Sequence, residues 1–224
     1  MITATTNGTP TLEATASPSG VRSIADPRVD RVVAAVASLP FAYMLHYRLA
    51  EGFDLPRIAL ALNYALLIAT MVVRRPPSRV TPRPLYWATA FLATYWVFMT
   101  LGLTDAGSAI APTAVTHAIA LASLAVALFA RLSLGRNIGF VPAQRELVTS
   151  YAYSIVRHPI YAGLFLSLTG FVLRAYSPRN LLVSAIGAGL FIVKTFMEED
   201  FLREDPAYAR YMQRVRSRWI PGLA

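Results

Sequence analysis

The chain has 224 residues, of which 55% are hydrophobic and 15% charged, and its mean hydropathy is +0.47. This apolar excess lies outside the usual range for soluble domains and predicts an integral membrane protein. The sequence contains no cysteine, which excludes disulfides, thiolate metal sites, cysteine nucleophiles and cysteine lipidation. Its three histidines, His46, His117 and His158, stand too far apart for helical ligand spacing, so we predict no metal site.

Residues 1–30 are rich in Thr, Ala, Ser, Pro and Gly, and we interpret them as a disordered leader rather than a cleaved signal peptide. Further along, four apolar stretches approach the roughly 20 residues that cross a bilayer. They cover residues 32–50, 57–73, 84–103 and 110–130. Two shorter stretches, 159–175 and 180–197, are separated by the turn-forming sequence YSPRN and predict a helical hairpin that spans or re-enters the membrane.

We therefore expect an all-α integral membrane protein with five to six transmembrane helices. The patterns divide the chain into the leader (1–30), an N-terminal four-helix transmembrane region (31–134) and a C-terminal region (135–224). The C-terminal region would contain a loop, the helical hairpin and an amphipathic tail helix at the membrane interface.

The formal net charge of +9 is compatible with nucleic acid, anionic lipid or membrane topology as its cause. Three connecting or terminal regions carry most of the arginines: Arg74, Arg75, Arg79 and Arg83; Arg131, Arg136, Arg145 and Arg157; and Arg203, Arg210, Arg214, Arg216 and Arg218. The opposite loops hold only Arg48, Arg57, Arg174 and Arg179. Because arginine favours the cytoplasmic side, this distribution predicts six segments with both termini cytoplasmic and no nucleic-acid partner. In a bacterium, the location would be the plasma membrane.

Two polar clusters interrupt the apolar C-terminal region. In SIVRHPIYAGLFL, Pro159 suits the first turn of a helix, which puts His158 near the N-cap beside Arg157. Such a helix start, with free amide donors, is expected to attract a carboxylate or phosphate. In KTFMEEDFL, Lys194 and Glu198 lie four residues apart on one helical face. The tail spaces Tyr208, Tyr211 or Met212, Val215 and Trp219 as the apolar face of an amphipathic helix.

Three stretches, LVTSYAYSIVRHPIYAG, KTFMEEDFL and YARYMQRVRSRWIPGL, occur in an order and spacing that resemble the C-terminal signature of the isoprenylcysteine carboxyl methyltransferase family and its phospholipid methyltransferase relatives. The resemblance covers residues 135–223, whereas the first four segments match only as generic membrane helices. It implies an integral membrane methyltransferase with S-adenosylmethionine as cofactor. The pocket would lie at the cytosolic face, built by the last helices and the tail, and the acceptor would be a lipophilic or lipidated molecule from the bilayer, methylated on a carboxylate or a lipid headgroup.

Matched residue by residue, the resemblance implies cofactor contacts by Arg145, Glu146, Leu147, Val148, Tyr153, Arg157, His158, Pro159, Ile160, Tyr161, Glu198 and Glu199. Lys194 falls where the family has an arginine that faces the substrate carboxylate. Two positions depart from the family pattern: Tyr151 replaces a glycine, and Lys194 keeps the charge but lacks the bidentate fork of arginine. Direct displacement at a sulfonium methyl depends on positioning and exclusion of water, so we assign no acid or base residue.

Structural interpretations of the same residues stay open. Arg157 and His158 could anchor a helix at the headgroups, Tyr153, Tyr161 and Trp219 could be interfacial aromatics, and Lys194 could be the counter-ion of Glu198. Two further functions are open as well. Sterol reductases share a related C-terminal pattern, which would imply an NADPH-dependent oxidoreductase, and the chain could also be a small transporter or a structural membrane protein. The double glutamate of MEEDFL favours the methyltransferase.

Overall fold

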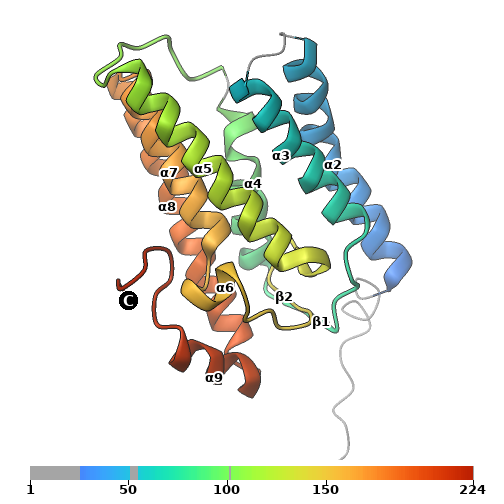
Figure 1. The fold of residues 1–224 in the computed structure, drawn as a ribbon. Helices are drawn as coiled ribbons and strands as arrows, with labels where there is room; N and C mark the ends of the chain where they lie inside the picture. Colours follow the sequence, from blue (N-terminus) through green and yellow to red (C-terminus); the bar gives the residue numbers. More distant parts are fainter. Residues whose placement is uncertain (1–25, 51–54, 101, 224) are drawn as a thin grey trace, which may run out of the picture.

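The computed structural model describes residues 26–50, 55–100 and 102–223, and Figure 1 shows its ribbon. Six long helices form the body of the described structure. They are α2 (Pro27–Ala50), α3 (Leu55–Val72), α4 (Pro84–Met99), α5 (Thr113–Leu134), α7 (Pro159–Arg174) and α8 (Pro178–Leu202). The shorter elements are strand β1 (Arg79–Val80), the 3-10 helix η1 (Gly135–Asn137), strand β2 (Ala143–Gln144) and the helices α6 (Ala152–Ile155) and α9 (Pro206–Arg214).

The six apolar stretches of the sequence are all helical in the structure, with boundaries that differ by a few residues. Proline begins α4, α7, α8 and α9, where its fixed φ fits the first turn and its missing N–H costs nothing. The side chains of Ser177 and Asp205 cap α8 and α9 by accepting hydrogen bonds from the N–H groups of Asn180 and Ala207. The expected all-helical architecture is therefore confirmed, apart from the two-residue strands.

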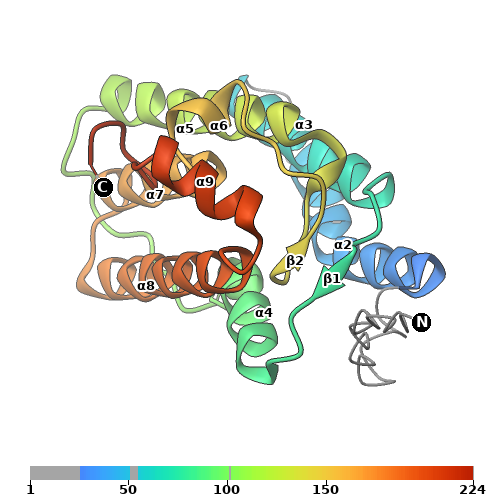
Figure 2. The ribbon, with the colours of Figure 1, turned by 90° about the horizontal axis from the view of Figure 1, so that it is seen from below.

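Successive long helices run in opposite directions, so that β1, β2, α6 and α9 gather at one end of the bundle (Figures 1 and 2). We call this the basic end, because the loops and helix ends there carry most of the arginines. They are Arg28, Arg31, Arg74, Arg75, Arg79, Arg83, Arg131, Arg136, Arg145, Arg157, Arg203, Arg210, Arg214, Arg216 and Arg218. β1 and β2 pair antiparallel there, with Val80 opposite Ala143.

Two glycines allow long helices to approach each other closely. A Cβ on Gly163 of α7 would lie 3.0 Å from the carbonyl oxygen of Ser123 in α5, which packs along α7. A Cβ on Gly187 of α8 would lie 2.8 Å from the Trp96 ring of α4. The Trp96 indole donates a hydrogen bond of 2.9 Å to the carbonyl oxygen of Val183, which joins α4 to α8. These contacts fix the helices that carry the C-terminal polar residues.

An aromatic core joins α2, α3 and α4 to the loop before β2. Phe41 is buried in α2 and packs edge-on against Phe98 at a centroid distance of 5.1 Å. It also stacks on Phe140 at 6.2 Å. The Tyr95 hydroxyl donates a 2.7 Å hydrogen bond to the carbonyl oxygen of Ala37. The N-terminal helices thus hold the loop that leads to the C-terminal region.

The outer face of the bundle is apolar, as expected for contact with lipid. Large apolar side chains are exposed on α2, α3, α4, α5 and α8, among them Val36, Leu62, Val97, Phe129 and Ile186. Two helical segments are long and apolar enough to cross a membrane, Thr113–Asn137 and Pro178–Leu202, and two more are apolar but shorter, Ala61–Val72 and Pro159–Arg174. These features support a membrane protein, and the number of spans stays a prediction.

Two terminal segments differ from the sequence-based expectation. The expected leader lies mostly outside the described residues, but α2 already begins at Pro27 and buries Asp30. At the other end, α9 is only nine residues long and its apolar residues Tyr208 and Tyr211 are buried inside the protein. The expectation that Trp219 extends this helix is wrong: it lies beyond α9 and its indole donates to Thr195 Oγ1 at 3.2 Å. The apolar face of the tail therefore contacts the protein rather than a bilayer.

Candidate active site

The start of α7 is tied to the C-terminal tail. His158 is the N-cap of α7 and Pro159 its first residue, as the sequence predicts. The backbone N–H of Arg157 donates to the carbonyl oxygen of Ser217 at 3.0 Å, and that of His158 donates to Arg218 at 2.8 Å. The expectation of free amide donors at this helix start is therefore wrong at these two positions, because the tail already occupies them.

Glu199 is fully buried near the end of α8 and is surrounded by three basic side chains. Its Oε1 accepts a 2.7 Å hydrogen bond from Arg157 Nε and lies 3.2 Å from His158 Nε2. Its Oε2 accepts from Arg218 Nε at 3.1 Å. Arg157 also donates through Nη1 to two carbonyl oxygens of the tail, at 2.6 and 2.7 Å. The carboxylate of Glu199 thus holds the tail against α7 and α8.

Glu198 lies near Nδ1 of the His158 ring, whereas Glu199 lies near Nε2, and Glu198 has fewer close partners than Glu199. The Tyr161 hydroxyl lies 2.8 and 2.9 Å from its two carboxylate oxygens. His158 Nδ1 and Lys194 Nζ are each 3.8 Å away, and 15% of the Glu198 side chain is exposed. The imidazole of His158 stacks on the Tyr161 ring at a centroid distance of 5.5 Å. Because a carboxylate can accept about four hydrogen bonds, Glu198 has acceptor capacity left for a ligand.

Lys194 is buried one helical turn before Glu198, with 4% of its side chain exposed. Its ammonium donates to Thr94 Oγ1 of α4 at 3.2 Å and lies 5.5 Å from the centre of the Tyr161 ring. The distance of 3.8 Å to Glu198 makes their ion pair a loose one. The sequence leaves two roles open for Lys194, a contact with the acceptor or a counter-ion for Glu198. Both roles require Lys194 to lie beside Glu198, as it does in the structure.

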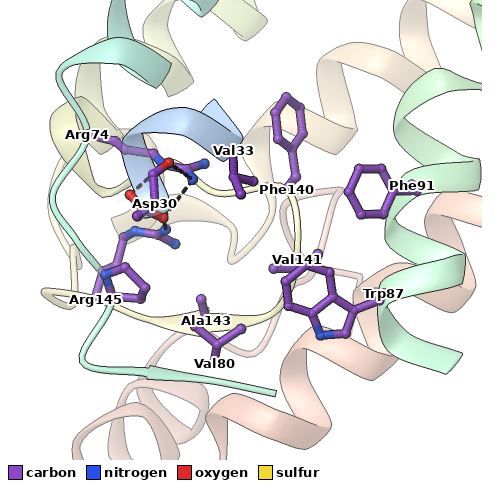
Figure 3. Close-up of a pocket in the computed structure, with 11 residues that line it drawn as sticks. Asp30, Val33, Arg74, Val80, Trp87, Phe91, Phe140, Val141, Ala143 and Arg145 are labelled. Atoms are coloured by element: carbon purple, nitrogen blue, oxygen red, sulfur yellow. Dashed lines mark hydrogen bonds and ion pairs between the residues drawn. The ribbon is translucent and has the colours of Figure 1, made fainter. Parts of the chain in front are cut away.

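The loop from Arg145 to Val148 sends its side chains in two directions. Arg145 turns toward Asp30 and Arg74 (Figure 3). Arg74 binds Asp30 Oδ1 at 2.6 Å, whereas Arg145 Nη2 stays 3.7 Å from the same oxygen. Burial lowers the pKa of Arg145 to about 10. A cavity of about 20 Å³ beside this group, walled by residues such as Phe91 and Phe140, holds little more than one water molecule. Arg145 therefore joins the start of α2, not the partners of Glu198.

The next residues of this loop line a second, polar pocket of about 350 Å³. Its walls include Asn137 from η1 and Glu146, Leu147 and Val148 from the loop. Glu146 forms an exposed ion pair with Arg75. The Asn137 Oδ1 atom is one of two buried side-chain polar atoms without a hydrogen-bond partner among the described residues. Asn137 thus carries a buried, unused acceptor in the wall of this pocket, next to residues that the resemblance implicates.

Tyr153 is a core residue rather than a pocket residue. It forms a buried cluster with Ala130 and Ala152, against which Val148 and Ile160 pack. Its carbonyl oxygen accepts a 2.7 Å hydrogen bond from the Tyr211 hydroxyl. Burial raises the pKa values of the Tyr153, Tyr208 and Tyr211 phenols above their ordinary value. This cluster lies between Val148 of the polar pocket and Ile160 at the start of α7.

Tyr151 adopts a backbone conformation that suits glycine. Its φ of 53° and ψ of −123° lie in a region that side chains with a Cβ rarely occupy, and 70% of the residue is exposed. The resemblance places a glycine at this position. The turn before α6 therefore keeps the glycine-like geometry although the residue is a tyrosine.

Of the residues predicted for the site, the structure brings together Arg157, His158, Tyr161, Glu198 and Glu199. Pro159 and Ile160 lie next to them in the first turn of α7. Two partners were not predicted: Thr94, which contacts Lys194, and Arg218, which contacts Glu199. The tail sequence RSRW gave only a general basic signal for Arg218, and no sequence signal distinguishes Thr94 within its apolar helix.

This arrangement groups two carboxylates, a histidine and a lysine into one polar site at the basic end of an apolar helical bundle. Residues 114–209 match the family model of phospholipid methyltransferases. This match confirms the resemblance to the isoprenylcysteine carboxyl and phospholipid methyltransferase family of membrane methyltransferases over α5 to α9. No curated protein matches the chain.

Proposed function

We propose that the protein is an S-adenosylmethionine-dependent methyltransferase that methylates a lipophilic acceptor at the cytosolic membrane surface. The observation that carries this proposal is the position of Glu198 within the family-matched region. Its carboxylate is held by Tyr161, faces His158 and is still 15% exposed. A carboxylate at the end of an apolar helix is costly unless it is paired or hydrated, which favours a role for it in binding.

The chemical groups present fit this cofactor. When bound, S-adenosylmethionine supplies an activated methyl group on a positively charged sulfonium. Glu198 is suited to a cationic or hydrogen-bond-donating part of the cofactor, since its oxygens keep acceptor capacity. The unpartnered Oδ1 of Asn137, buried in the wall of the polar pocket, would be a second acceptor for amino or hydroxyl donors if a side-chain rotation exposed it. Leu147 and Val148 supply apolar walls to that pocket.

We assign supporting roles to the other predicted residues. His158 and Tyr161 orient Glu198 through their contacts with its carboxylate. Arg157 and Glu199 hold the tail in place and act on the cofactor indirectly. Arg145 stabilises the N-terminal part of the loop through Asp30. The tail packs against the start of α7 and the end of α8, where it would limit the access of water to the place of methyl transfer.

The membrane arrangement belongs to the same proposal. Six long helices in alternating directions, with the arginines concentrated at one end, favour six spans and a cytoplasmic basic end. The site would then face the compartment that contains the cofactor. The acceptor's apolar part would stay in the bilayer while its reactive group reaches Glu198 and Lys194.

Lipid mass spectrometry tests the proposal directly. Membranes containing the protein are incubated with S-adenosylmethionine labelled in the methyl group, next to membranes without the protein. We expect label in a lipid or lipidated product only where the protein is present, and fragment masses will separate a methyl ester from a methylated headgroup. An unlabelled lipid fraction, together with tight NADPH binding, would instead support a reductase.

A further inference from the structure

Three buried charged side chains border the cavity shown in Figure 3. Arg74 follows α3, Asp30 lies in the first turn of α2, and Arg145 follows β2. Only 5%, 8% and 6% of these side chains are exposed, in the same order. Asp30 is the one acidic residue that the described part of the chain contributes to the cavity wall. Two guanidinium groups thus share one carboxylate, and the wall carries one positive charge in excess.

Asp30 binds the two arginines unequally. Arg74 donates through Nε and Nη2 to the two carboxylate oxygens, at 2.9 and 2.6 Å, and Nη2 also lies 3.0 Å from the backbone carbonyl oxygen of Asp30. Arg145 Nη2 stays 3.7 Å from Asp30 Oδ1, which is longer than a hydrogen bond. Asp30 therefore neutralises Arg74, and Arg145 has no hydrogen-bonded carboxylate among the described residues.

Arg145 has donors left over at the cavity wall. Its Nε donates at 2.9 Å to the carbonyl oxygen of Arg75, which is the one hydrogen bond of this guanidinium within the described residues. The two Nη groups supply four further N–H donors. Gly139 makes room for them, because a Cβ at that position would collide with Arg145 Nη1. Burial of such a guanidinium is costly unless another acceptor or counter-ion is present.

We propose that this cavity binds one small inorganic anion, chloride, beside Arg145. The volume of about 20 Å³ admits an ion not much larger than water and excludes a carboxylate or phosphate that is attached to an acyl chain. Apolar side chains such as Phe91 and Phe140 complete the wall, which favours a monovalent ion over a multiply charged and more strongly hydrated one.

The anion would act on the stability of the fold. It offsets the excess charge at the junction between the start of α2 and the segments that carry Arg74 and Arg145. Because the ion binds the folded state, the stability of this junction depends on the chloride concentration. The site is distinct from the polar site around Glu198, and the proposal does not depend on methyl transfer.

Thermal unfolding of the full chain in detergent tests the proposal. The protein is purified in sodium gluconate, and chloride then replaces gluconate at constant sodium concentration and pH. We expect the unfolding temperature to rise by roughly 2–4 °C and to reach a plateau, as for a ligand that binds only the folded state. Bromide should act like chloride, whereas gluconate is too large for the cavity. An unfolding temperature that does not depend on either halide overturns the proposal.

Variants assign the effect to Arg145. The chloride-dependent shift should vanish in Arg145→Gln, and Arg145→Lys should keep part of it because the positive charge remains. The matched control is Arg210→Gln, which removes an exposed arginine of α9 at the same end of the bundle and should keep the full shift. Equal shifts in Arg145→Gln and Arg210→Gln contradict the assignment.

Bromide also locates the ion in the wild type, which decides the question even if Arg145→Gln does not fold. In crystals grown with bromide as the halide, we expect an anomalous-scattering peak inside the cavity, within contact distance of an Nη atom of Arg145. Density for a water molecule there without an anomalous peak would identify a hydration site and overturn the proposal.

Discussion

Arg157 and Glu199 form a buried ion pair of 2.7 Å, with 4% and 1% of their side chains exposed. The pair joins the residue before α7 to the end of α8. Because Arg157 also donates to two carbonyl oxygens of the tail, the same contact fixes the chain that follows α9. This pair is therefore the main link between the three segments that surround the candidate site.

Glu199→Gln should destabilise the protein strongly. It leaves the buried guanidinium of Arg157 without its counter-ion, and removing one partner of such a pair costs about 3–5 kcal/mol. We expect a lower unfolding temperature in detergent and faster tryptic cleavage in the tail at Arg216 and Arg218. Asp200→Asn is the matched control, because this neighbouring carboxylate is 42% exposed in its ion pair with Arg83. Equal effects of the two substitutions would mean that the Glu199 network does not hold the tail.

Tyr151→Gly should stabilise the protein. Residues with a Cβ in such backbone conformations cost about 1–3 kcal/mol, which exceeds the extra unfolded-state entropy of glycine. We expect a net gain of about 1 kcal/mol, measured as a higher unfolding temperature. Tyr151→Ala separates the backbone effect from loss of the ring, since it keeps the Cβ. If alanine stabilises as much as glycine, the positive φ of Tyr151 carries no strain.

The buried tyrosines predict a loss of stability in alkali. A phenol whose folded pKa lies above its unfolded value of about 10 stays protonated in the native state while the unfolded chain releases the proton. Burial raises the pKa of Tyr153, Tyr208 and Tyr211 in this way. Their contribution is complete below pH ~10 and decreases as the pH rises further. Absorbance at the tyrosinate band should therefore rise in step with loss of helical circular dichroism.

Tyr208→Phe isolates one of these groups. It removes the phenol that would ionise, so the variant should lose less stability between neutral and alkaline pH than the wild type. Tyr176→Phe, at an exposed position at the other end of the bundle, should leave the pH dependence unchanged. A parallel pH dependence in all three proteins contradicts the linkage argument.

The absence of native cysteine makes the topology directly testable by labelling. Single cysteines are placed at exposed residues by Ser78→Cys and Gln213→Cys at the basic end, and by Ala106→Cys at the other. With a cytoplasmic basic end, a membrane-impermeant maleimide should label only Ala106→Cys in intact cells. The other two should react after permeabilisation. Labelling of Gln213→Cys in intact cells would place the tail outside and rule out a cytosolic site.

The helices of this protein could be predicted from its sequence because apolar stretches of bilayer length have few alternatives to helix. His158 could be placed at an N-cap because Pro159 fixes the first turn. Glu198 and Tyr161 could be brought together only through the family resemblance, since they lie 37 residues apart. Local periodicity contains no information on such a contact.

Other contacts between residues distant in the sequence could not be predicted for the same reason. The contact of Arg145 with Asp30 across the fold could not be predicted, because a polar N-terminal segment gives no signal of a buried aspartate. The spacing of Tyr208 and Tyr211 correctly indicated one apolar helical face, but spacing does not say whether that face meets lipid or protein. Here it packs against Leu147 and Leu202.

Calorimetric titration of S-adenosylmethionine into the wild type and Glu198→Gln is the most direct test of the proposed function. The substitution keeps the shape of the side chain and removes the charge that we assign to cofactor binding. Loss of such a charged hydrogen bond costs about 1.5–3 kcal/mol, so the affinity should fall roughly ten- to a hundredfold while the unfolding temperature changes little. Binding of S-adenosylmethionine with the same affinity to both proteins would contradict the account and leave Glu198 as the structural counter-ion of Lys194.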